Sequence, residues 1–368
     1  MDIDAGVDRD KNMNNDNGAN MGTEYNGERS SGDDKAAYGI AMSSRIRLAR
    51  NYRDYPFPAR LSADAARKIL EMTKETFFSS KEINTNDYLY VDMQELDPIE
   101  RIMLVEKHLA SPELASGNKP CAAIISKDES VSIMLNEEDH LRIQCITGST
   151  AIDEALEKCS TMERILESKH DIAYDMNLGY LTSCPTNLGT GMRASFMLHL
   201  PALVAAGQIN GILEQCGRIG VAIRGIYGEF SAPSGNMFQF SNHGSLGNNE
   251  SEIVNNIKNV GTQIIEHEHR LRLGVLEQSK TKFEDRVCRS LGVLTSARIL
   301  DTGEFMTLWS SVRLGVDMGV IEDVDIKTLD ELMAQSQSAS LQKMAGRTLT
   351  PEERDVQRAN LVRKRLAR

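Results

Sequence analysis

Two short apolar runs separated by four polar residues restrict the fold of this chain more than any other feature. Ala122–Ser126 and Val131–Leu135 each have the length and composition of a buried strand, and the residues KDES at 127–130 form a turn between them. A connection this short joins strands only in an antiparallel pair, because a parallel crossover needs about a dozen residues. The sequence therefore predicts an α+β fold with an antiparallel sheet flanked by helices, rather than a doubly wound parallel sheet.

Further alternating runs place arginines on one face of the predicted sheet. The runs cover residues 43–48, 140–146 and 219–226, and the arginines on their polar faces are Arg45, Arg47, Arg142 and Arg224. If the second strand extends back to Glu138, that carboxylate shares the face of His140 and Arg142. Such a face has two interpretations, since arginine is mostly exposed in proteins. It is either simply solvated, or its guanidinium forks converge on the oxygens of a polyanion such as phosphate.

Composition and periodicity divide the chain into three parts. Residues 1–35 are rich in Asn, Gly and acidic residues and poor in apolar ones, so we expect a disordered leader that cannot offset the entropy of ordering. Residues 36–260 mix strand-like and helical runs and are predicted to form an α+β domain. Residues 261–368 are predicted to form a helical domain, because apolar residues recur at three- and four-residue steps from about 251 onward. The residues TPEE at 350–353 form a capping box that predicts the start of the last helix.

Charge and composition exclude several classes of function. The net charge of −11 and the 5% aromatic content argue against direct binding of nucleic acid. No run approaches the roughly 18 apolar residues of a membrane span, and the first residues lack a secretory pattern, so neither a membrane nor a secreted protein is expected. The six cysteines show no C-x-x-C spacing, which favours a reducing cytoplasm. No metal site is predicted, because His267 and His269 point to different sides of a helix.

A glycine-containing loop is predicted at Cys184–Ser195, with the sequence CPTNLGTGMRAS. Thr and Asn followed by two glycines and an apolar run indicate a loop that leads into a helix. Its backbone N–H groups are candidates for contacts with phosphate oxygens. Cys184 is either a thiolate stabilised by nearby cations or a buried structural cysteine. No P-loop, protein-kinase catalytic loop or dinucleotide-binding fingerprint is present in the sequence.

Four segments together resemble the ATP:guanidino phosphotransferases. They are SRIR at 44–47, NEEDHLR at 136–142, the CPTNLGTGMRAS loop and RGIYGE at 224–229. Within that family the sequence is most similar to the bacterial protein-arginine kinases, over about residues 38–368. The resemblance implies an ATP-dependent kinase with a guanidino-kinase-like catalytic domain over 36–260. It also implies a C-terminal domain, 261–368, for dimerisation and phosphoarginine binding.

The resemblance implies roles for individual residues. Glu138 is the expected carboxylate that orients the substrate guanidinium and accepts its proton, Glu229 is the second carboxylate, and Cys184 is the reactive cysteine beside the guanidinium. The residues expected to bind ATP are Ser43, Ser44, Arg45, Ile46, Arg47, His108, Arg142, Arg193, Ala194, Ser195, Phe196, Met197, Arg224, Gly225, Ile226, Tyr227, Gly228 and Glu229. The residues expected to bind phosphoarginine at an allosteric site are Arg354, Asp355, Arg358 and Ala359. Without the resemblance, His108 is equally well explained as a surface histidine, and the C-terminal arginines as a solvated basic face.

The expected cofactors are ATP and Mg²⁺, with the ion held mostly by phosphate oxygens and water. By resemblance, the expected partners are protein substrates with exposed arginines, a zinc-binding activator protein, a stress-response repressor, a Clp ATPase and a second copy of the chain. A protein substrate is favoured because only residues 1–43 precede Ser44, where kinases of small guanidino compounds carry a helical domain. Two other functions stay open, a phosphagen kinase acting on free arginine and a non-catalytic adaptor that reads phosphoarginine.

Overall fold

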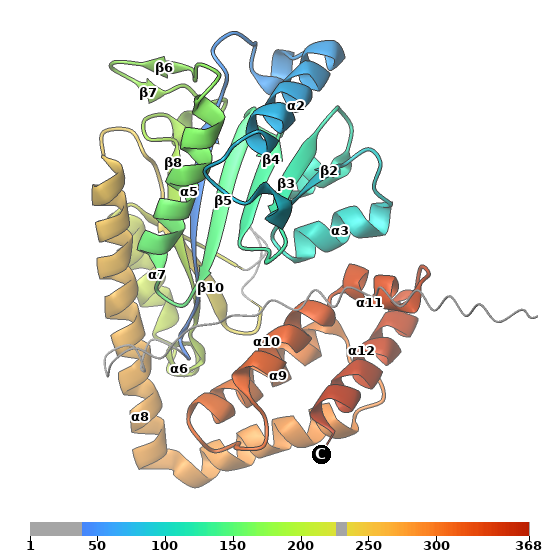
Figure 1. The fold of residues 1–368 in the computed structure, drawn as a ribbon. Helices are drawn as coiled ribbons and strands as arrows, with labels where there is room; N and C mark the ends of the chain where they lie inside the picture. The colour runs from blue at the N-terminus through green and yellow to red at the C-terminus, as the bar shows by residue number, and fades with distance from the viewer. Residues whose placement is uncertain (1–38, 226–233, 368) are drawn as a thin grey trace, which may run out of the picture.

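An eight-stranded antiparallel sheet forms the centre of the protein (Figure 1). The structure, a computed structural model, describes residues 39–225 and 234–367. In their order across the sheet, the strands are β2 (Tyr88–Asp92), β3 (Ala122–Ser126), β4 (Val131–Leu135), β5 (Leu141–Gly148), β1 (Ala41–Arg50), β8 (Met192–His199), β10 (Met237–Asn242) and β9 (Val221–Arg224). All neighbouring strands pair antiparallel, and β3 and β4 form the hairpin around residues 127–130. The predicted α+β fold is confirmed.

Helices cover one face of this sheet and bury its apolar side chains. They are α2 (Ala63–Phe78), α5 (Ile152–Glu167) and the first part of α8 (Glu250–Ser296). Ile69, Cys159 and Ile257 from these helices pack in one core with Ile46 and Phe196 of the central strands. Alternation along the central strands places Arg45, Arg47 and Arg193 on the other face, and near β3 and β4 that face carries a smaller apolar core that includes Ala123, Ile125 and Met134. The smaller elements are α3 (Pro98–Glu106), α4 (Pro112–Ser116), α6 (Pro201–Ala205), α7 (Ile209–Arg218), β6 (Tyr174–Asp175), β7 (Gly179–Tyr180) and three 3₁₀ turns at Pro58–Arg60, Thr85–Asp87 and Pro185–Asn187.

The C-terminal region is helical, as predicted. The 47-residue α8 leaves helical geometry at Ser279, and α9 (Thr302–Asp317), α10 (Ile326–Gln335), α11 (Ser338–Ala345) and α12 (Pro351–Leu366) follow. These helices enclose a second core around Trp309. The capping box at Thr350 and Glu353 is confirmed. The predicted domain boundary near residue 260 falls inside α8, and the predicted leader, 1–35, lies outside the described residues. Among the helices that the structure describes, none is both long and apolar enough to cross a membrane.

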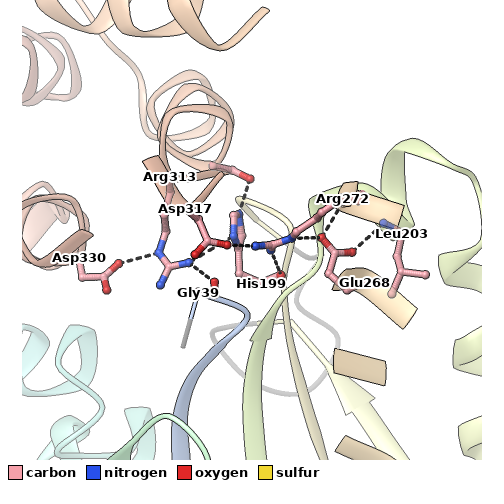
Figure 2. A network of polar contacts seen from close by, with 10 residues as sticks. Gly39, His199, Leu203, Glu268, Arg272, Arg313, Asp317 and Asp330 are labelled. Atoms are coloured by element: carbon pink, nitrogen blue, oxygen red, sulfur yellow. Dashed lines mark hydrogen bonds and ion pairs between the residues drawn. The ribbon is translucent and has the colours of Figure 1, made fainter. Parts of the chain in front are cut away.

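A buried network of charged groups joins the sheet to the helical region (Figure 2). Arg313 of α9 donates to Asp330 Oδ1 at 2.9 Å and to the carbonyl of Gly39 at 2.6 Å, just before β1. Arg272 of α8 donates to the carbonyl of His199, at the end of β8, at 2.9 Å. Removing one partner of such a network leaves an uncompensated buried charge, which is strongly destabilising. The network therefore fixes α8 and α9 against the ends of the two central strands.

The apolar run after the glycine loop forms strand β8, so the helix predicted there is wrong. Every second residue from Met192 onward is apolar and faces the core, among them Ala194, Phe196 and Leu198. This is the two-residue period of a strand buried on one side. The loop therefore leads into a strand, and the contact of its backbone N–H groups with phosphate stays a prediction.

The strand predicted to reach back to Glu138 begins only at Leu141. Residues 136–140 form a loop between β4 and β5 instead. Asn136 has a φ of 57°, in the left-handed region, and donates its N–H to the carbonyl of His140 at 2.9 Å. Asparagine tolerates this conformation better than most residues, which allows the chain to turn here. Glu138 is thus presented by a loop and not by a strand face.

Candidate active site

Five arginines from four strands lie on the face of the sheet opposite the first core. They are Arg45 and Arg47 on β1, Arg142 on β5, Arg193 on β8 and Arg224 on β9. Arg47 is directly opposite Arg193, and the pairings of β5, β10 and β9 keep Arg142 and Arg224 on the same side of the pleat. Directly opposed residues of antiparallel strands point to one face, so the register alone brings these side chains together. We call this surface the arginine face.

The arginine face concentrates positive charge in a partly desolvated place. The pKa of Arg47 lies well below its usual value, first because the side chain is buried. Three neighbouring cations, Arg142, Arg45 and Arg193, lower it further by repelling its charge. An anion bound among the guanidinium groups relieves this repulsion. Because arginine forks bond phosphate oxygens in pairs, a polyphosphate is the ligand that suits this face best.

His108 lies beside the arginine face, in the turn that follows α3. Burial and, to a smaller extent, the charges of Arg45 and Arg47 lower the pKa of His108 to about 3, so its imidazole is neutral at pH 7. Gln144 Nε2 donates to the His108 carbonyl at 2.7 Å, and Gln144 is directly opposite Arg47 in the sheet. The structure thus brings His108 to the predicted nucleotide site, and its contact with a nucleotide stays a prediction.

The loop between β4 and β5 carries two carboxylates in different environments. Glu137 Oε1 accepts a hydrogen bond from Arg142 Nη1 at 2.7 Å, and the side chain is almost completely buried. Burial has the largest single effect and opposes ionisation of Glu137, but the charge of Arg142 and the hydrogen bonds from Ser111, Arg142 and the Glu138 backbone together outweigh it, so the pKa of Glu137 is lowered. The pKa of Glu138 is raised, first by partial burial and then by repulsion from Asp139 and Glu137. Glu137 is therefore the ionised partner of an arginine, and Glu138 is the stronger base of the two.

A buried carboxylate connects this acidic loop to the loop that carries Cys184. Asp139 Oδ1 accepts one hydrogen bond from Asn51 Nδ2 at 2.6 Å and another from the backbone N–H of Ser183 at 2.7 Å. Asp139 directly follows Glu138, and Ser183 directly precedes Cys184. The backbones of the two predicted catalytic residues are therefore held against each other by one side chain. No role for Asn51 is predicted from the sequence, because no local pattern marks this residue.

The glycine loop is shaped by a buried arginine, Arg50, for which the sequence predicts no role. Arg50 Nη1 donates to the carbonyl of Thr190 at 3.0 Å. Gly191 has a φ of 61°, and a Cβ at this position would lie 2.6 Å from the same Arg50 nitrogen, so only glycine fits. Cys184 is half-buried, and its Sγ lies 3.0 Å from Thr186 Oγ1. The side chain of Cys184 is thus accessible at the edge of the site and is not a fully buried structural cysteine.

The other residues predicted to bind ATP fall into three groups. Ser43, Ser195 and Met197 lie on the arginine face. Ser44, Ile46, Ala194 and Phe196 alternate onto the side of the first core. Gly225 directly follows β9, whereas Ile226, Tyr227, Gly228 and Glu229 lie outside the described residues. The roles of all these residues stay predictions.

The residues predicted to bind phosphoarginine lie on α12, and they are Arg354, Asp355, Arg358 and Ala359. The Arg358 side chain is 1% exposed. Its Nε donates to the carbonyl of Ser336 at 2.9 Å, and its Nη1 donates to the carbonyl of Leu300 and to Asp355 Oδ1, each at 2.7 Å. Arg354 and Asp355 are half-buried, and Ala359 belongs to the second core. Arg358 therefore anchors α12, and phosphoarginine binding here stays a prediction.

Comparison with known proteins gives two family matches. Residues 68–271 match the ATP:guanido phosphotransferase, C-terminal catalytic domain, and residues 280–368 match the Protein-arginine kinase McsB C-terminal domain. A protein-arginine kinase of Caldanaerobacter subterraneus subsp. tengcongensis is 46% identical over 88% of this chain and 96% of its own length. One from Moorella thermoacetica is 45% identical over 89% of this chain and 94% of its own length. A crystal structure of lombricine kinase shares the fold, with a TM-score of 0.55 and 22% identity over 64% of this chain and 68% of that chain.

Proposed function

The chain belongs to the ATP:guanido phosphotransferase family, and we propose that it is a protein-arginine kinase, which transfers the γ-phosphoryl group of ATP to arginine side chains of proteins. The observation that carries the proposal is the arginine face with a raised-pKa carboxylate, Glu138, on the adjacent loop. The two relatives named above support arginine as the acceptor, because the chain matches almost their whole length. The C-terminal match supports a protein rather than free arginine as the substrate.

The arginine face supplies the charge for phosphoryl transfer. Arg45, Arg47 and Arg193 converge from adjacent strands, so they suit a chain of phosphates whose oxygens each need donors. Charge that develops on the transferring group and on the departing ADP is neutralised by the same fixed cations. Most of the catalysis of phosphoryl transfer comes from such positioning and electrostatic stabilisation. The guanidinium groups are held by a rigid sheet, so little reorganisation is needed during the reaction.

The substrate guanidinium must lose a proton as it reacts, because its pKa lies above about 12. A carboxylate accepts two N–H bonds from the guanidinium fork and fixes its orientation. In the proposed step a terminal nitrogen attacks the γ-phosphorus, the nitrogen–phosphorus bond forms and the bond to the bridging oxygen of ADP breaks. The proton passes to the carboxylate of Glu138, whose raised pKa makes it a better acceptor. By family resemblance, Glu229 is the second carboxylate, and a Cys184 thiolate stabilises the substrate cation.

Mg²⁺ is proposed to bind with the nucleotide. In residues 39–225 and 234–367, no group of three or more His, Cys, Asp or Glu side chains is placed to hold a metal ion. The arginine face fits the phosphates themselves. Magnesium commonly keeps several waters and is held by substrate phosphates, where it adds positive charge next to the transferring group.

The wider role is proposed from the family resemblance. We propose that the kinase acts in the cytoplasm as a homodimer through its C-terminal helices, with allosteric binding of phosphoarginine at Arg354, Asp355, Arg358 and Ala359. The proposed partners are a zinc-binding activator, a stress-response repressor and a Clp ATPase that receives the marked proteins. The C-terminal family match supports this, since it covers the residues of the proposed allosteric site.

The test is the partition of phosphate between protein and free arginine. The purified protein is incubated with γ-labelled ATP, Mg²⁺, a mixed protein substrate and free arginine. Acid-labile label on protein, lost in Glu138→Ala, is the expected result, since phosphorus–nitrogen bonds hydrolyse in acid. Glu82→Gln is the matched control, because it removes an exposed carboxylate that pairs with Arg164 on the opposite side of the sheet. Label only on free arginine would favour a phosphagen kinase, and phosphoarginine binding without any transfer would favour an adaptor.

A further inference from the structure

Helix α11 of the C-terminal region begins without a side-chain cap of its own. Its N-cap residue, Gln337, makes no capping hydrogen bond. The cap comes from α3, where Glu106 Oε1 accepts the N–H of Ala339 at 2.7 Å and Glu106 Oε2 accepts the N–H of Ser340 at 3.0 Å. Ser340 Oγ also donates to Glu106 Oε2, at 3.2 Å. A carboxylate at a helix N-terminus satisfies unpaired N–H groups and is favoured by the helix dipole.

Glu106 is the last residue of α3, and His108 follows two residues later. His108 has a φ of 60°, a left-handed conformation that is costly for a residue other than glycine and persists only where the surroundings hold it. On the sheet side, Gln144 donates to the His108 carbonyl at 2.7 Å and Ser132 Oγ donates to the Leu109 carbonyl at 2.5 Å. Ser132 is opposite Gln144 in the sheet, and Gln144 is opposite Arg47. The turn at His108 is therefore hydrogen-bonded to two residues that lie in line with Arg47 across neighbouring strands.

The far side of the cap is fixed as well. Arg358 of α12 donates to the carbonyl of Ser336, two residues before α11 begins. Figure 1 shows α3 beside α11, at the place where the sheet domain meets the C-terminal helices. A second contact between the same two helices joins Lys343 to Glu100 at 2.5 Å, and this pair is partly exposed. Hydrogen bonds therefore join α12 to the start of α11 and α11 to Glu106, and the backbone joins Glu106 to His108.

We propose that Glu106 is a positioning residue for nucleotide binding, through which the seating of α11 sets the placement of His108 at the arginine face. The C-terminal helices then control the affinity for ATP without contacting it. This inference rests on the proposed function, because it assigns the arginine face to a nucleotide. Any change that displaces α11 then alters the nucleotide site through Glu106.

The experiment compares Glu106→Ala, Glu106→Gln and Lys343→Ala in the full chain. Lys343→Ala is the matched control, since it breaks the other α3–α11 bond and leaves the cap intact. We expect Glu106→Ala to raise both the Kd for a non-hydrolysable ATP analogue and the KM for ATP at least about fivefold, the lower end of usual coupling between sites. kcat should change less than about twofold, and Lys343→Ala should match the wild type. Glu106→Gln, which keeps one acceptor oxygen, should lie between, and it carries the test if the alanine variant does not fold.

Amide hydrogen exchange over residues 107–110 gives a readout that needs no nucleotide. It should be faster in Glu106→Ala and unchanged in Lys343→Ala. Unchanged ATP affinity and exchange in the Glu106 variants would overturn the inference. So would an equal loss of affinity in Lys343→Ala, because the effect would then belong to the helix contact in general. If the wild type binds the analogue but transfers no phosphoryl group, the proposed function fails, while the affinity and exchange comparisons still decide the role of Glu106.

Discussion

Replacing Asp139 by alanine tests the connection between the acidic loop and the Cys184 loop. The carboxylate is 2% exposed and accepts hydrogen bonds from Asn51 Nδ2 and from the N–H of Ser183. A buried donor without a partner costs about 1–3 kcal/mol, so losing the bond to Asn51, which is completely buried, lowers the free energy of unfolding by about 1–3 kcal/mol. Ser183 is exposed, so water can replace the bond to its N–H and the loss there adds little. Asp139→Asn keeps an acceptor oxygen and is expected to cost about half as much. Because the backbones at Glu138 and Cys184 lose their common anchor, kcat should fall by more than the loss of folded protein explains.

Urea unfolding with linear extrapolation measures the free energy, and initial rates on a protein substrate measure kcat. Asp128→Ala is the control, because Asp128 also accepts several hydrogen bonds, from Ser126 and Ser130, but in an exposed turn where water replaces them. It should cost less than about 1 kcal/mol. The reasoning would be refuted if Asp139→Ala were as stable as Asp128→Ala, or if its kcat equalled that of the wild type.

Three further predictions concern the site itself. Arg47→Ala should raise the KM for ATP about 10- to 100-fold, since a hydrogen bond to a charged group contributes about 1.5–3 kcal/mol, and an unchanged KM would remove Arg47 from the nucleotide site. The pKa of Glu138 is higher in the folded than in the unfolded state, so ionisation of this carboxylate lowers the stability of the fold. Glu138→Gln should therefore be more stable than the wild type at pH 7 but not at pH 3, where the carboxylate is protonated in both states. Thermal unfolding at the two pH values measures this difference. Cys184→Ser should lower turnover and leave the unfolding curve unchanged, because the half-buried thiol borders the site without supporting the core, and full activity would exclude it from the reaction.

The sequence predicts on which face of its strand each arginine lies, but it does not predict which strands pair to bring the arginines together. Alternation with a two-residue period puts Arg45 and Arg47 on one face of a strand, and this follows from local pattern alone. That Arg193 is opposite Arg47 depends on the register of β1 with β8, which are separated by well over a hundred residues. Pairing at such separation is set by the packing of the whole sheet, and no local signal encodes it.

The misread segments have identifiable physical causes. The apolar run at 192–199 follows two glycines, which suggested a loop entering a helix, while its alternation matched a strand. The alternation that begins at His140 also fits the residues back to Glu138, so the sequence predicts a longer β5. In the structure residues 136–140 form a loop, which begins at Asn136 in a left-handed conformation. The roles of Asn51 and Glu106 cannot be predicted from the sequence, because their partners are distant in the chain and an isolated Asn or Glu has no distinguishing pattern.

The central claim is that this chain places phosphate on arginine nitrogen in a protein, using the arginine face and Glu138. The most direct measurement is mass-spectrometric mapping, under non-acidic conditions, of an acceptor protein with a single exposed arginine after reaction with ATP and Mg²⁺. The account predicts phosphate on that arginine with the wild type and none with Glu138→Ala or with the acceptor's arginine replaced by lysine. Phosphate on serine, threonine or tyrosine, or an unchanged yield with Glu138→Ala, would contradict it.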